Sequence, residues 1–497
     1  MAVEISEQKT ILDKQSSGSN LNPGQKMLIG GKWVGCDQVI EVKDPQDNSL
    51  IDTVPAASKD DMLHCIEMAK EGAKIAAAMS VHERMRVING AADFIERHKD
   101  RFANTIAREG SKTIKEAMKE TNRCIQTLRV SAEEARRING ETIAFDQMPG
   151  SENRVGYYYR FPIGIIGAIT PFNDPLNLVA HKVGPAIASG NAIIVKPATV
   201  TPLSAIMLAQ AFTYAGLPHQ VLSVITGYGS EIGDVLVTHP DIRMISFTGG
   251  VEAGEDIVRK AGLKKISMEL GSNSPVIVLE DADLEDAVNS TVSGAFWAAG
   301  QNCLGVQRIY VQETIFERFQ KAFISCTEQY RVGDKQSEET DMGPLITEKE
   351  AIRVENMVNE AIEKGAILLT GGRRNGAFYS PTVLTNVPEN SKIAKEEIFG
   401  PVALLYSVSD LDDAIQKSNS VDYGLQAGIF TKNLEKAHKA IAKMDVGGIM
   451  INDSGDYRID AMPFGGVKKS GLGREGIKFA IQEMTEPKVV CFKLMEQ

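Results

Sequence analysis

The chain has 497 residues, of which 43% are hydrophobic and 24% charged, and its formal net charge is −11. A chain of this length exceeds what one hydrophobic core supports, so we expect two or three domains. The acidic balance argues against a broad surface for nucleic acid or anionic membranes, and no apolar run is long enough to cross a bilayer.

The first 26 residues are polar and lack both the apolar core of a signal peptide and the arginine-rich pattern of a transit peptide. We therefore expect residues 1–26 to be a flexible tail and the protein to be cytoplasmic. The six cysteines are far apart without a Cys-x-x-Cys pair, and the seven histidines have no metal-ligand spacing. We expect neither a disulfide framework nor a metal site.

Short strands are predicted over residues 27–55, followed by long amphipathic helices over 59–142. The pattern then changes: apolar strands at 163–172, 191–198, 221–227 and 244–249 alternate with helices. Buried strands that alternate with helices predict a doubly wound parallel sheet, here extending to about residue 270. A second α/β run continues to about residue 480.

Two segments do not fit either run. Residues 146–162 are typical of an extended hairpin, and residues 486–494 of an isolated apolar strand. Because such strands expose an edge that another subunit can cover, we expect them to join subunits in a homodimer or homotetramer.

The loops that follow the four strands of the first run carry candidate binding residues. Asn173 lies in "TPFNDP" and Lys196 in "KPATVTP", while Gly229 and Gly233 lie in "GYGSEIG" and a glycine pair opens "GGVEAG". Each loop alone is explained by turn chemistry. Four in succession at strand ends favour a nucleotide, with backbone N–H groups suited to phosphate.

Two further residues are candidates for chemistry. Glu269 is the single charged group in "ISMELGS", which fits either a structural ion pair or a general base. Cys303 follows Gly-Gln-Asn, and a lone cysteine usually fills space in a core. "EEIFGP" places Glu397 and Phe399 in a turn, and the glycine-rich segment 462–476 is suited to cover a cleft.

Taken together, these motifs resemble those of the NAD(P)-dependent aldehyde dehydrogenase superfamily. The resemblance covers about residues 27–495 and rests on "PFNDPLN", "GNAIIVKPA", "FTGG", "MELGSNSP", "GQNC", "EEIFGPV" and "PFGGVKKSG", in the family's order. It implies an α/β fold with a doubly wound cofactor domain, an α/β catalytic domain and a β oligomerisation flap. The implied cofactor domain comprises residues 27–145 and 163–270, the catalytic domain 271–480, and the oligomerisation strands 146–162 and 481–497.

The resemblance also implies roles for the candidates. Cys303 would attack the aldehyde carbonyl, Asn173 and the backbone N–H of Cys303 would stabilise the oxyanion, and Glu269 would activate the water that releases the acid. The cofactor, NAD or NADP with NAD favoured, would be bound by ten residues: Lys196, Thr199, Gly229, Gly233, Phe247, Thr248, Gly249, Gly250, Glu397 and Phe399.

Two positions depart from the family pattern. Thr199 stands where NAD-preferring members often carry a glutamate that grips the ribose hydroxyls and repels a 2′-phosphate, so NADP stays open. Gly250 replaces the serine of "FTGS", which removes one hydroxyl.

The substrate is the least specified part of the interpretation. The motifs "PFNDPLNLVAHK" and "INDSGDYRIDAMPFGG" most resemble a subgroup that includes lactaldehyde, phosphonoacetaldehyde and sulfolactaldehyde dehydrogenases. Arg123 and Arg458 are candidates to bind an anionic substrate, because a guanidinium matches sulfonate, phosphonate or carboxylate oxygens; surface arginines are the alternative. We expect a short, anionic aldehyde such as sulfolactaldehyde, phosphonoacetaldehyde or succinate semialdehyde.

Three alternatives stay open at this point. One is a broad dehydrogenase of neutral aldehydes such as lactaldehyde. Another is a cysteine hydrolase without redox chemistry, which needs a histidine or equivalent base near Cys303. The third, a non-catalytic structural protein, is disfavoured because both Cys303 and Glu269 are present. Glu269 also favours water over coenzyme A as acyl acceptor.

Overall fold

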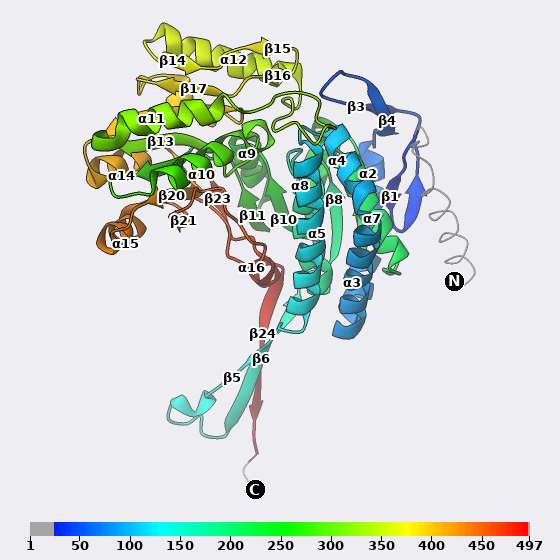
Figure 1. The fold of residues 1–497 in the computed structure, drawn as a ribbon. Helices are drawn as coiled ribbons and strands as arrows, with labels where there is room; N and C mark the ends of the chain where they lie inside the picture. The colour runs from blue at the N-terminus through cyan, green and yellow to red at the C-terminus, as the bar shows by residue number, and fades with distance from the viewer. Residues whose placement is uncertain (1–23, 496–497) are drawn as a thin grey trace.

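The computed structural model describes residues 24–495. Figure 1 shows two β-sheets with their covering helices, and a thin β arm that projects from this body. The predicted tail lies outside the described residues except for its last three positions. There, the N–H groups of Gly24 and Gln25 donate to Asp52 Oδ1 and Thr53 O, both at 2.9 Å. The α/β fold class is confirmed.

The first sheet has eight strands in the order β2-β1-β9-β8-β7-β10-β11-β23. The strands are β1 (Met27–Ile29), β2 (Lys32–Val34), β7 (Ile165–Ile169), β8 (Ala192–Lys196), β9 (Leu222–Val224), β10 (Ile242–Thr248), β11 (Lys265–Glu269) and β23 (Gly471–Leu472). The five strands from β9 to β11 are parallel. Their near-continuous apolar sequences follow from burial on both faces.

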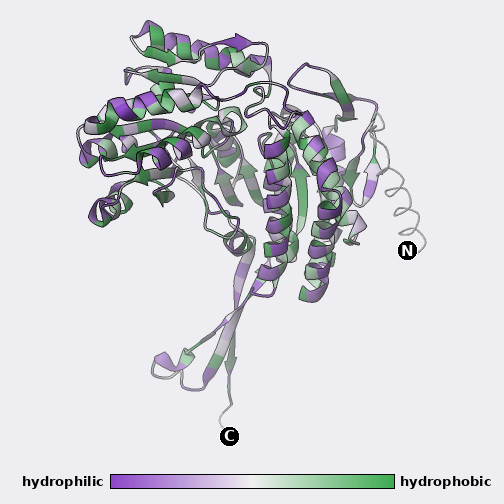
Figure 2. Cartoon of the chain, in the orientation of Figure 1, coloured by the Kyte–Doolittle hydropathy of each residue, from purple (hydrophilic) through white to green (hydrophobic). Residues whose placement is uncertain are grey.

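Helices cover both faces of this sheet. They are α2 (Lys59–Ala78), α3 (Val81–Arg97), α4 (Lys99–Glu109), α5 (Ile114–Ala135), α6 (Asn177–Ala188), α7 (Leu203–Tyr214), α8 (Asp234–Thr238) and α9 (Val251–Ala261). Capping boxes at Ser58, Ser80 and Thr113 start α2, α3 and α5. Figure 2 shows hydrophobic and hydrophilic stripes along the long helices, as expected for helices with one buried face.

The strand order reverses between β7 and β10. From β7 the chain builds outward to β8 and β9, and then returns to add β10 and β11 on the other side. In such a sheet, ligands bind outside the carboxyl ends of the strands where the order reverses. The loops that carry Asn173 and the glycine pair 249–250 leave the sheet at this point.

The second sheet has the order β14-β17-β18-β13-β12-β20-β21. Its strands are β12 (Ser274–Val278), β13 (Val306–Gln312), β14 (Ile367–Thr370), β17 (Thr382–Thr385), β18 (Val402–Val408), β20 (Gln426–Phe430) and β21 (Gly448–Ile451). The helices of this half are α10 (Leu284–Phe296), α11 (Glu313–Thr327), α12 (Glu348–Glu363), α13 (Lys392–Lys395), α14 (Leu411–Asn419) and α15 (Leu434–Lys443). Three two-stranded ribbons complete the body: β3 (Val39–Lys43) with β4 (Leu50–Pro55), β15 (Arg374–Asn375) with β16 (Phe378–Tyr379), and β19 (Tyr423–Gly424) with β22 (Val467–Lys468).

The arm is a three-stranded sheet of β5 (Glu141–Ile143), β6 (Arg154–Pro162) and β24 (Thr485–Lys493). Two expectations need correction. The hairpin begins at Glu141 rather than 146, and the supposedly isolated C-terminal strand pairs with β6 along its whole length. The second pairing joins residues more than 300 positions apart, which a local sequence pattern does not reveal.

Near its C-terminus, the chain returns to the first sheet. The short strand β23 pairs with β11, and α16 (Ile477–Glu483) packs against α5 and α6. Residues 471–483 thus lie with the first sheet, although residues up to 480 were expected to lie with the second. Within residues 24–495, no helix is long and apolar enough to span a membrane.

Candidate active site

The candidate residues Glu269 and Cys303 lie where the two sheets meet. Glu269 is the last residue of β11, and the chain continues from it through residues 270–273 into β12 of the second sheet. Cys303 lies just before β13, which is the neighbour of β12. The carboxyl end of β11 in the first sheet therefore lies near the amino ends of β12 and β13 in the second sheet.

The turn before Cys303 has an unusual backbone. Ala298 and Ala299 have φ values of 50° and 55°, and Gly300 follows with a φ of 69°. A Cβ on Gly300 would lie 2.2 Å from the carbonyl oxygen of Gly400, so glycine is required there. Left-handed alanines cost energy and persist only where neighbouring contacts hold them.

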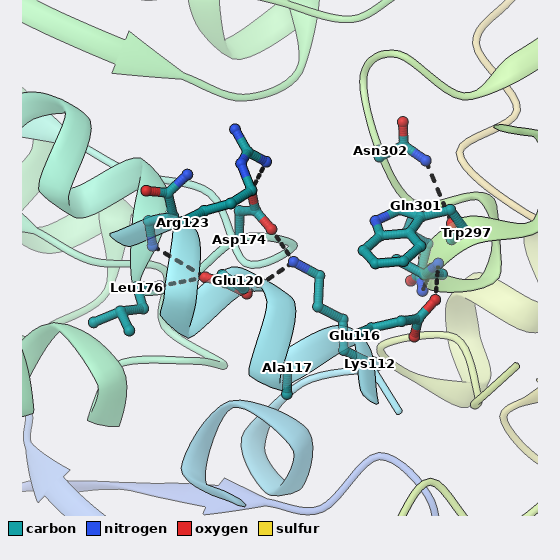
Figure 3. Close-up of polar contacts among 12 residues, drawn as sticks. Lys112, Glu116, Ala117, Glu120, Arg123, Asp174, Leu176, Trp297, Gln301 and Asn302 are labelled. Atoms are coloured by element: carbon teal, nitrogen blue, oxygen red, sulfur yellow. Dashed lines mark hydrogen bonds and ion pairs between the residues drawn. The ribbon is translucent and has the colours of Figure 1, made fainter. Parts of the chain in front are cut away.

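Several side chains supply those contacts (Figure 3). The buried Glu116 of α5 accepts from the backbone N–H of Ala298 at 2.8 Å. The Gln301 amide donates to Ala298 O at 3.1 Å and accepts from the Ile346 N–H at 2.9 Å. Asn302 Nδ2 donates to Trp297 O at 3.3 Å. The loop that presents Cys303 is therefore fixed on both sides.

The Cys303 thiol is half-buried and packs against the apolar cluster of Leu304, Leu425 and Phe464. Burial raises the pKa of this thiol to about 12, although the nearby charge of Arg458 acts in the opposite direction. The thiol is therefore protonated at neutral pH and needs a base before it can attack a carbonyl. Among the described residues, no hydrogen bond to Cys303 from a histidine occurs; His181 instead bonds to Asp460 at 2.8 Å.

The Glu269 carboxylate is buried, and neither of its oxygens has a hydrogen-bond partner among the described residues. Burial, followed by the negative charge of Glu475, raises the pKa of Glu269 well above its usual value. A buried carboxyl group with a raised pKa and free oxygens can exchange a proton with a water or a thiol in the same site.

Glu475 forms a buried ion-pair network beside Glu269. Its two oxygens accept from Lys182 Nζ at 3.0 Å and from Arg458 Nη2 at 3.1 Å. Burial raises the pKa of Glu475, but Lys182 and Arg458 outweigh burial and hold it at about 2. The site thus contains one charged glutamate and one that favours the neutral form.

The predicted nucleotide-binding loops lie together next to these residues. The Gly249 N–H donates to Glu269 O at 3.0 Å, and α9 begins just after Gly250. Gly250, Gly229 and Gly233 have open space where a Cβ would stand, so their backbones are accessible. Residues 229–233 form a π-helical turn ahead of α8.

Lys196 ends β8 and is buried, with its Nζ donating to Pro197 O at 3.2 Å. Burial lowers the pKa of Lys196 to about 8. The Thr199 hydroxyl bonds to Gly227 O at 3.4 Å, which places the two loops side by side. Phe247 lies under Gly249, while the Thr248 hydroxyl is buried without a partner within residues 24–495.

Glu397 and Phe399 approach from the second sheet. Glu397 Oε1 accepts from the Ser272 N–H at 2.7 Å, and burial raises its pKa to about 7. The ring of Phe399 meets that of Phe172 edge-on, with centroids 5.7 Å apart. Because Asn173 follows Phe172, this contact places the Asn173 loop against the Phe399 turn.

The chain matches the aldehyde dehydrogenase family over residues 33–490. Aspartate-semialdehyde dehydrogenase 1 of Pseudomonas canavaninivorans is 50% identical over 456 residues, which are 92% of this chain and 97% of that protein. The 3-sulfolactaldehyde dehydrogenase of Priestia aryabhattai is 45% identical over 468 residues, 94% of this chain and 98% of that one. This chain belongs to the aldehyde dehydrogenase family.

A solved structure leads to the same assignment. Aldehyde dehydrogenase 21 from Physcomitrella patens, in complex with its reaction product succinate, superposes with a TM-score of 0.93 at 39% identity. The match covers 95% of this chain and 99% of that one. The protein is thus an aldehyde dehydrogenase, and two solved relatives hold a cofactor, NADP in one and NAD in the other.

The loops at the carboxyl ends of the first sheet suit a dinucleotide. The N-terminus of α9 presents backbone N–H groups next to open glycines, which suits a pyrophosphate. The buried Lys196 has no carboxylate partner among the described residues and can hydrogen-bond a ribose. No cluster of metal-ligating side chains is found in the described part of the chain.

The two predicted arginines lie on one cavity of this aldehyde dehydrogenase. The cavity has a volume of about 510 Å³, and its wall includes Arg123, Arg458 and Asp460. Arg123 is partly exposed and donates to Asp460 Oδ1 at 2.8 Å. Arg458 lies with its guanidinium 3.7 Å over the ring of Phe464, which belongs to the cluster around Cys303.

Several of these residues were missed from the sequence. Lys182 and His181 lie in the fully buried and mostly apolar helix α6, and a charged residue in such a helix is a signal that could have been used. Glu475 and Asp460 lie in loops, where a polar residue carries no such signal.

Proposed function

We propose that this aldehyde dehydrogenase oxidises a short anionic aldehyde to the carboxylic acid, and that Arg458 binds the anion, whereas Arg123 lies on the same cavity paired with Asp460. The observation that carries the proposal is the state of Arg458. Its side chain is only 6% exposed, and its Nε has no hydrogen-bond partner among the described residues. An unpaired buried N–H is costly, and an anionic ligand relieves that cost.

The chemistry we propose uses three residues. The Cys303 thiol releases its proton to solvent, and the thiolate attacks the aldehyde carbon. Asn173 and the backbone N–H of Cys303 donate hydrogen bonds to the resulting oxyanion. After oxidation to a thioester, Glu269 takes a proton from a water that attacks the acyl carbon and releases Cys303. The free carboxylate oxygens of Glu269 support this proton transfer from water.

The cofactor supplies the hydride acceptor when it is bound. We propose that Lys196 and Thr199 face its adenosine ribose, and that Gly249 and Gly250, with Gly229 and Gly233 nearby, face the phosphates. Glu397 would hold the nicotinamide ribose and Phe399 would pack on the ring, while Phe247 and Thr248 would lie beside the same cofactor. Thr199 carries no charge that would exclude a 2′-phosphate, so both NAD and NADP fit this arrangement.

The names of relatives support an anionic substrate. Aspartate semialdehyde and 3-sulfolactaldehyde each carry an acidic group within a few bonds of the carbonyl, and the solved relative binds succinate. A chain at this level of identity can differ from each of them in its preferred acid group. The shared chemistry is a short aldehyde with a carboxylate or sulfonate.

A comparison of matched aldehydes tests the proposal. Wild-type enzyme should use succinate semialdehyde with a kcat/KM at least tenfold above that of butanal, which has the same number of carbons. Each charge-assisted hydrogen bond is worth about 1.5–3 kcal/mol, or about one to two decades in kcat/KM.

Substitution of Arg458 then tests whether this residue causes the preference for the anionic aldehyde. Arg458→Met should reduce turnover of succinate semialdehyde far more than that of butanal, and Arg458→Lys should recover only part of the loss. If butanal is the better substrate of the wild type, the enzyme is instead a dehydrogenase of neutral aldehydes.

A further inference from the structure

The cavity that holds the two arginines also presents carboxylates. Arg458 supplies a positive group, with Nη2 on Glu475 and the buried Nε without a partner in the described structure. Two residues further along the same loop, Asp460 supplies a negative group to the same wall. A cavity built only for an anion would not need the second charge.

Only one oxygen of the Asp460 carboxylate makes hydrogen bonds among the described residues. Its Oδ1 accepts from Arg123 Nη2 and is bonded to His181 Nε2, each at 2.8 Å. Both of these bonds go to Oδ1, and no hydrogen bond to Oδ2 occurs within residues 24–495, although a carboxylate can accept about four. Burial raises the pKa of Asp460, but His181 and Arg123 outweigh burial and hold it well below its usual value, so the group is charged at neutral pH.

Arg123 is less available to an anion than Arg458. Besides Asp460, its guanidinium has a second carboxylate nearby, since Asp174 Oδ2 lies 3.8 Å from Nη1. Figure 3 shows Asp174 between Arg123 and the buried Lys112. Two carboxylates around one guanidinium compensate its charge, so an anion placed there meets repulsion, whereas a cation is attracted.

The free donor and the free acceptor lie close together. His181 connects them: its Nε2 bonds to Asp460 Oδ1, and its Nδ1 lies 3.5 Å from Arg458 Nη2. The two charged groups are therefore separated by one imidazole ring together with its contacts of 2.8 Å to Asp460 and 3.5 Å to Arg458. Substituents of opposite charge on one carbon atom, as in an α-amino acid, match such an arrangement.

We propose that the cavity binds the α-amino acid end of a short semialdehyde, with Arg458 on the carboxylate and Asp460 on the ammonium group. The inference rests on the proposed function and adds a cation-binding residue to it. The reaction is unchanged: aldehyde, NAD(P)⁺ and water give the carboxylic acid, NAD(P)H and a proton. Asp460 acts as a specificity-determining residue that touches the substrate away from the reacting carbon.

The test uses two aldehydes that differ by one amino group. Aspartate semialdehyde and succinate semialdehyde have the same four carbons and the same spacing between carbonyl and carboxylate. Wild-type enzyme should prefer aspartate semialdehyde by tenfold or more in kcat/KM. Asp460→Asn should lower kcat/KM for aspartate semialdehyde at least tenfold more than it lowers kcat/KM for succinate semialdehyde.

Asp93→Asn provides the matched control. Asp93 is also an aspartate paired with an arginine, with Oδ1 3.2 Å from Arg129 Nη2, but it does not line the cavity. This variant should keep the wild-type ratio of the two substrates. An equal loss for both substrates in Asp460→Asn would overturn the role of Asp460.

Product binding provides a readout that does not depend on turnover. Calorimetry should show that the wild type binds L-aspartate at least tenfold more tightly than succinate, and that Asp460→Asn loses this preference. Equal use of both semialdehydes by the wild type, with butanal poorer than either, would leave the proposed anion recognition standing and overturn the amino acid assignment. If butanal exceeds both, the anionic substrate and the present inference are both wrong.

Discussion

The two buried glutamates of the site differ in charge because their partners differ. Glu475 has Lys182 and Arg458 within 3.1 Å, whereas the oxygens of Glu269 have no partner among the described residues. Two carboxyl groups in one buried site do not easily ionise together, so the pair of cations decides which one is charged. This leaves Glu269 as the group that can carry a proton through the reaction.

We predict that Glu269→Gln separates the two halves of the reaction. An amide cannot take a proton from water, so hydrolysis of the thioester should stop while a first turnover still occurs. Stopped-flow measurement should show a burst of NAD(P)H followed by a stall. Cys303→Ala is the control and should show neither burst nor turnover while it still binds the cofactor. Absence of the burst in Glu269→Gln would mean that Glu269 is already required to activate the thiol.

We predict that Glu475→Gln shifts the pH profile of kcat towards acid. The charge of Glu475 raises the pKa of Glu269, so its removal lowers that pKa, and the freed Lys182 and Arg458 act in the same direction. Glu269 then reaches its basic form at lower pH, and the rising limb of the profile moves with it. A rising limb that stays in place or moves to higher pH would contradict this electrostatic account.

At the scale of elements, the loop before Cys303 depends on a helix distant in sequence. The two carboxylate oxygens of Glu116 accept from different segments. One accepts from the Thr113 N–H in the capping box of α5, and the other accepts from the Ala298 N–H in the left-handed turn. The start of a helix in the first half of the chain and the turn that carries the thiol therefore share one carboxylate.

We predict that Glu116→Ala lowers stability by about 2–4 kcal/mol. Loss of a cap costs about 1 kcal/mol, and a buried N–H without a partner about 1–3 kcal/mol more. Glu83→Ala, which removes the exposed capping box of α3 alone, should cost about 1 kcal/mol and leave kcat unchanged. Denaturation midpoints and kcat, measured side by side, check both variants. Equal effects of the two variants would show that the contact with Ala298 contributes nothing.

These contacts also mark how far the sequence could predict the molecule. Periodicity sufficed for the long helices and for the buried strands of the first sheet, since those patterns are local. It did not reveal the bond between Glu116 and Ala298 or the Glu475–Lys182 pair, because such pairs join distant segments. Arg458 could be proposed as an anion-binding residue from its residue type and the subgroup resemblance. Asp460 could not, because its role depends on contacts with Arg123 and His181, which are distant in sequence.

At the scale of the whole molecule, the arm is the part without a covering layer. Apolar side chains of β6 and β24 are exposed there, among them Val155, Val489 and Phe492. β24 is also an edge strand of its sheet. Exposed apolar groups on an unpaired edge favour association with another copy of the chain. We therefore retain the proposal of a homodimer or homotetramer formed through the arm.

We predict that the double substitution Val489→Glu and Phe492→Glu reduces the particle to one chain. Light scattering should give a mass near 54.0 kDa for the variant and two or four times that value for the wild type. Leu434→Glu places the same charge on an exposed leucine at the start of α15 and should leave the mass unchanged. A fully active wild-type monomer at micromolar concentration would contradict the proposal.

The left-handed run at residues 298–300 limits which sequences can precede the thiol. Ala298 and Ala299 are buried, so bulky side chains do not fit, and their positive φ values disfavour β-branched ones. Gly300 accepts no side chain at all because of the Gly400 carbonyl. In a saturation library selected for growth on the substrate, these three adjacent positions should therefore appear as one intolerant block. Only glycine, alanine and asparagine should survive at the first two positions, and only glycine at the third.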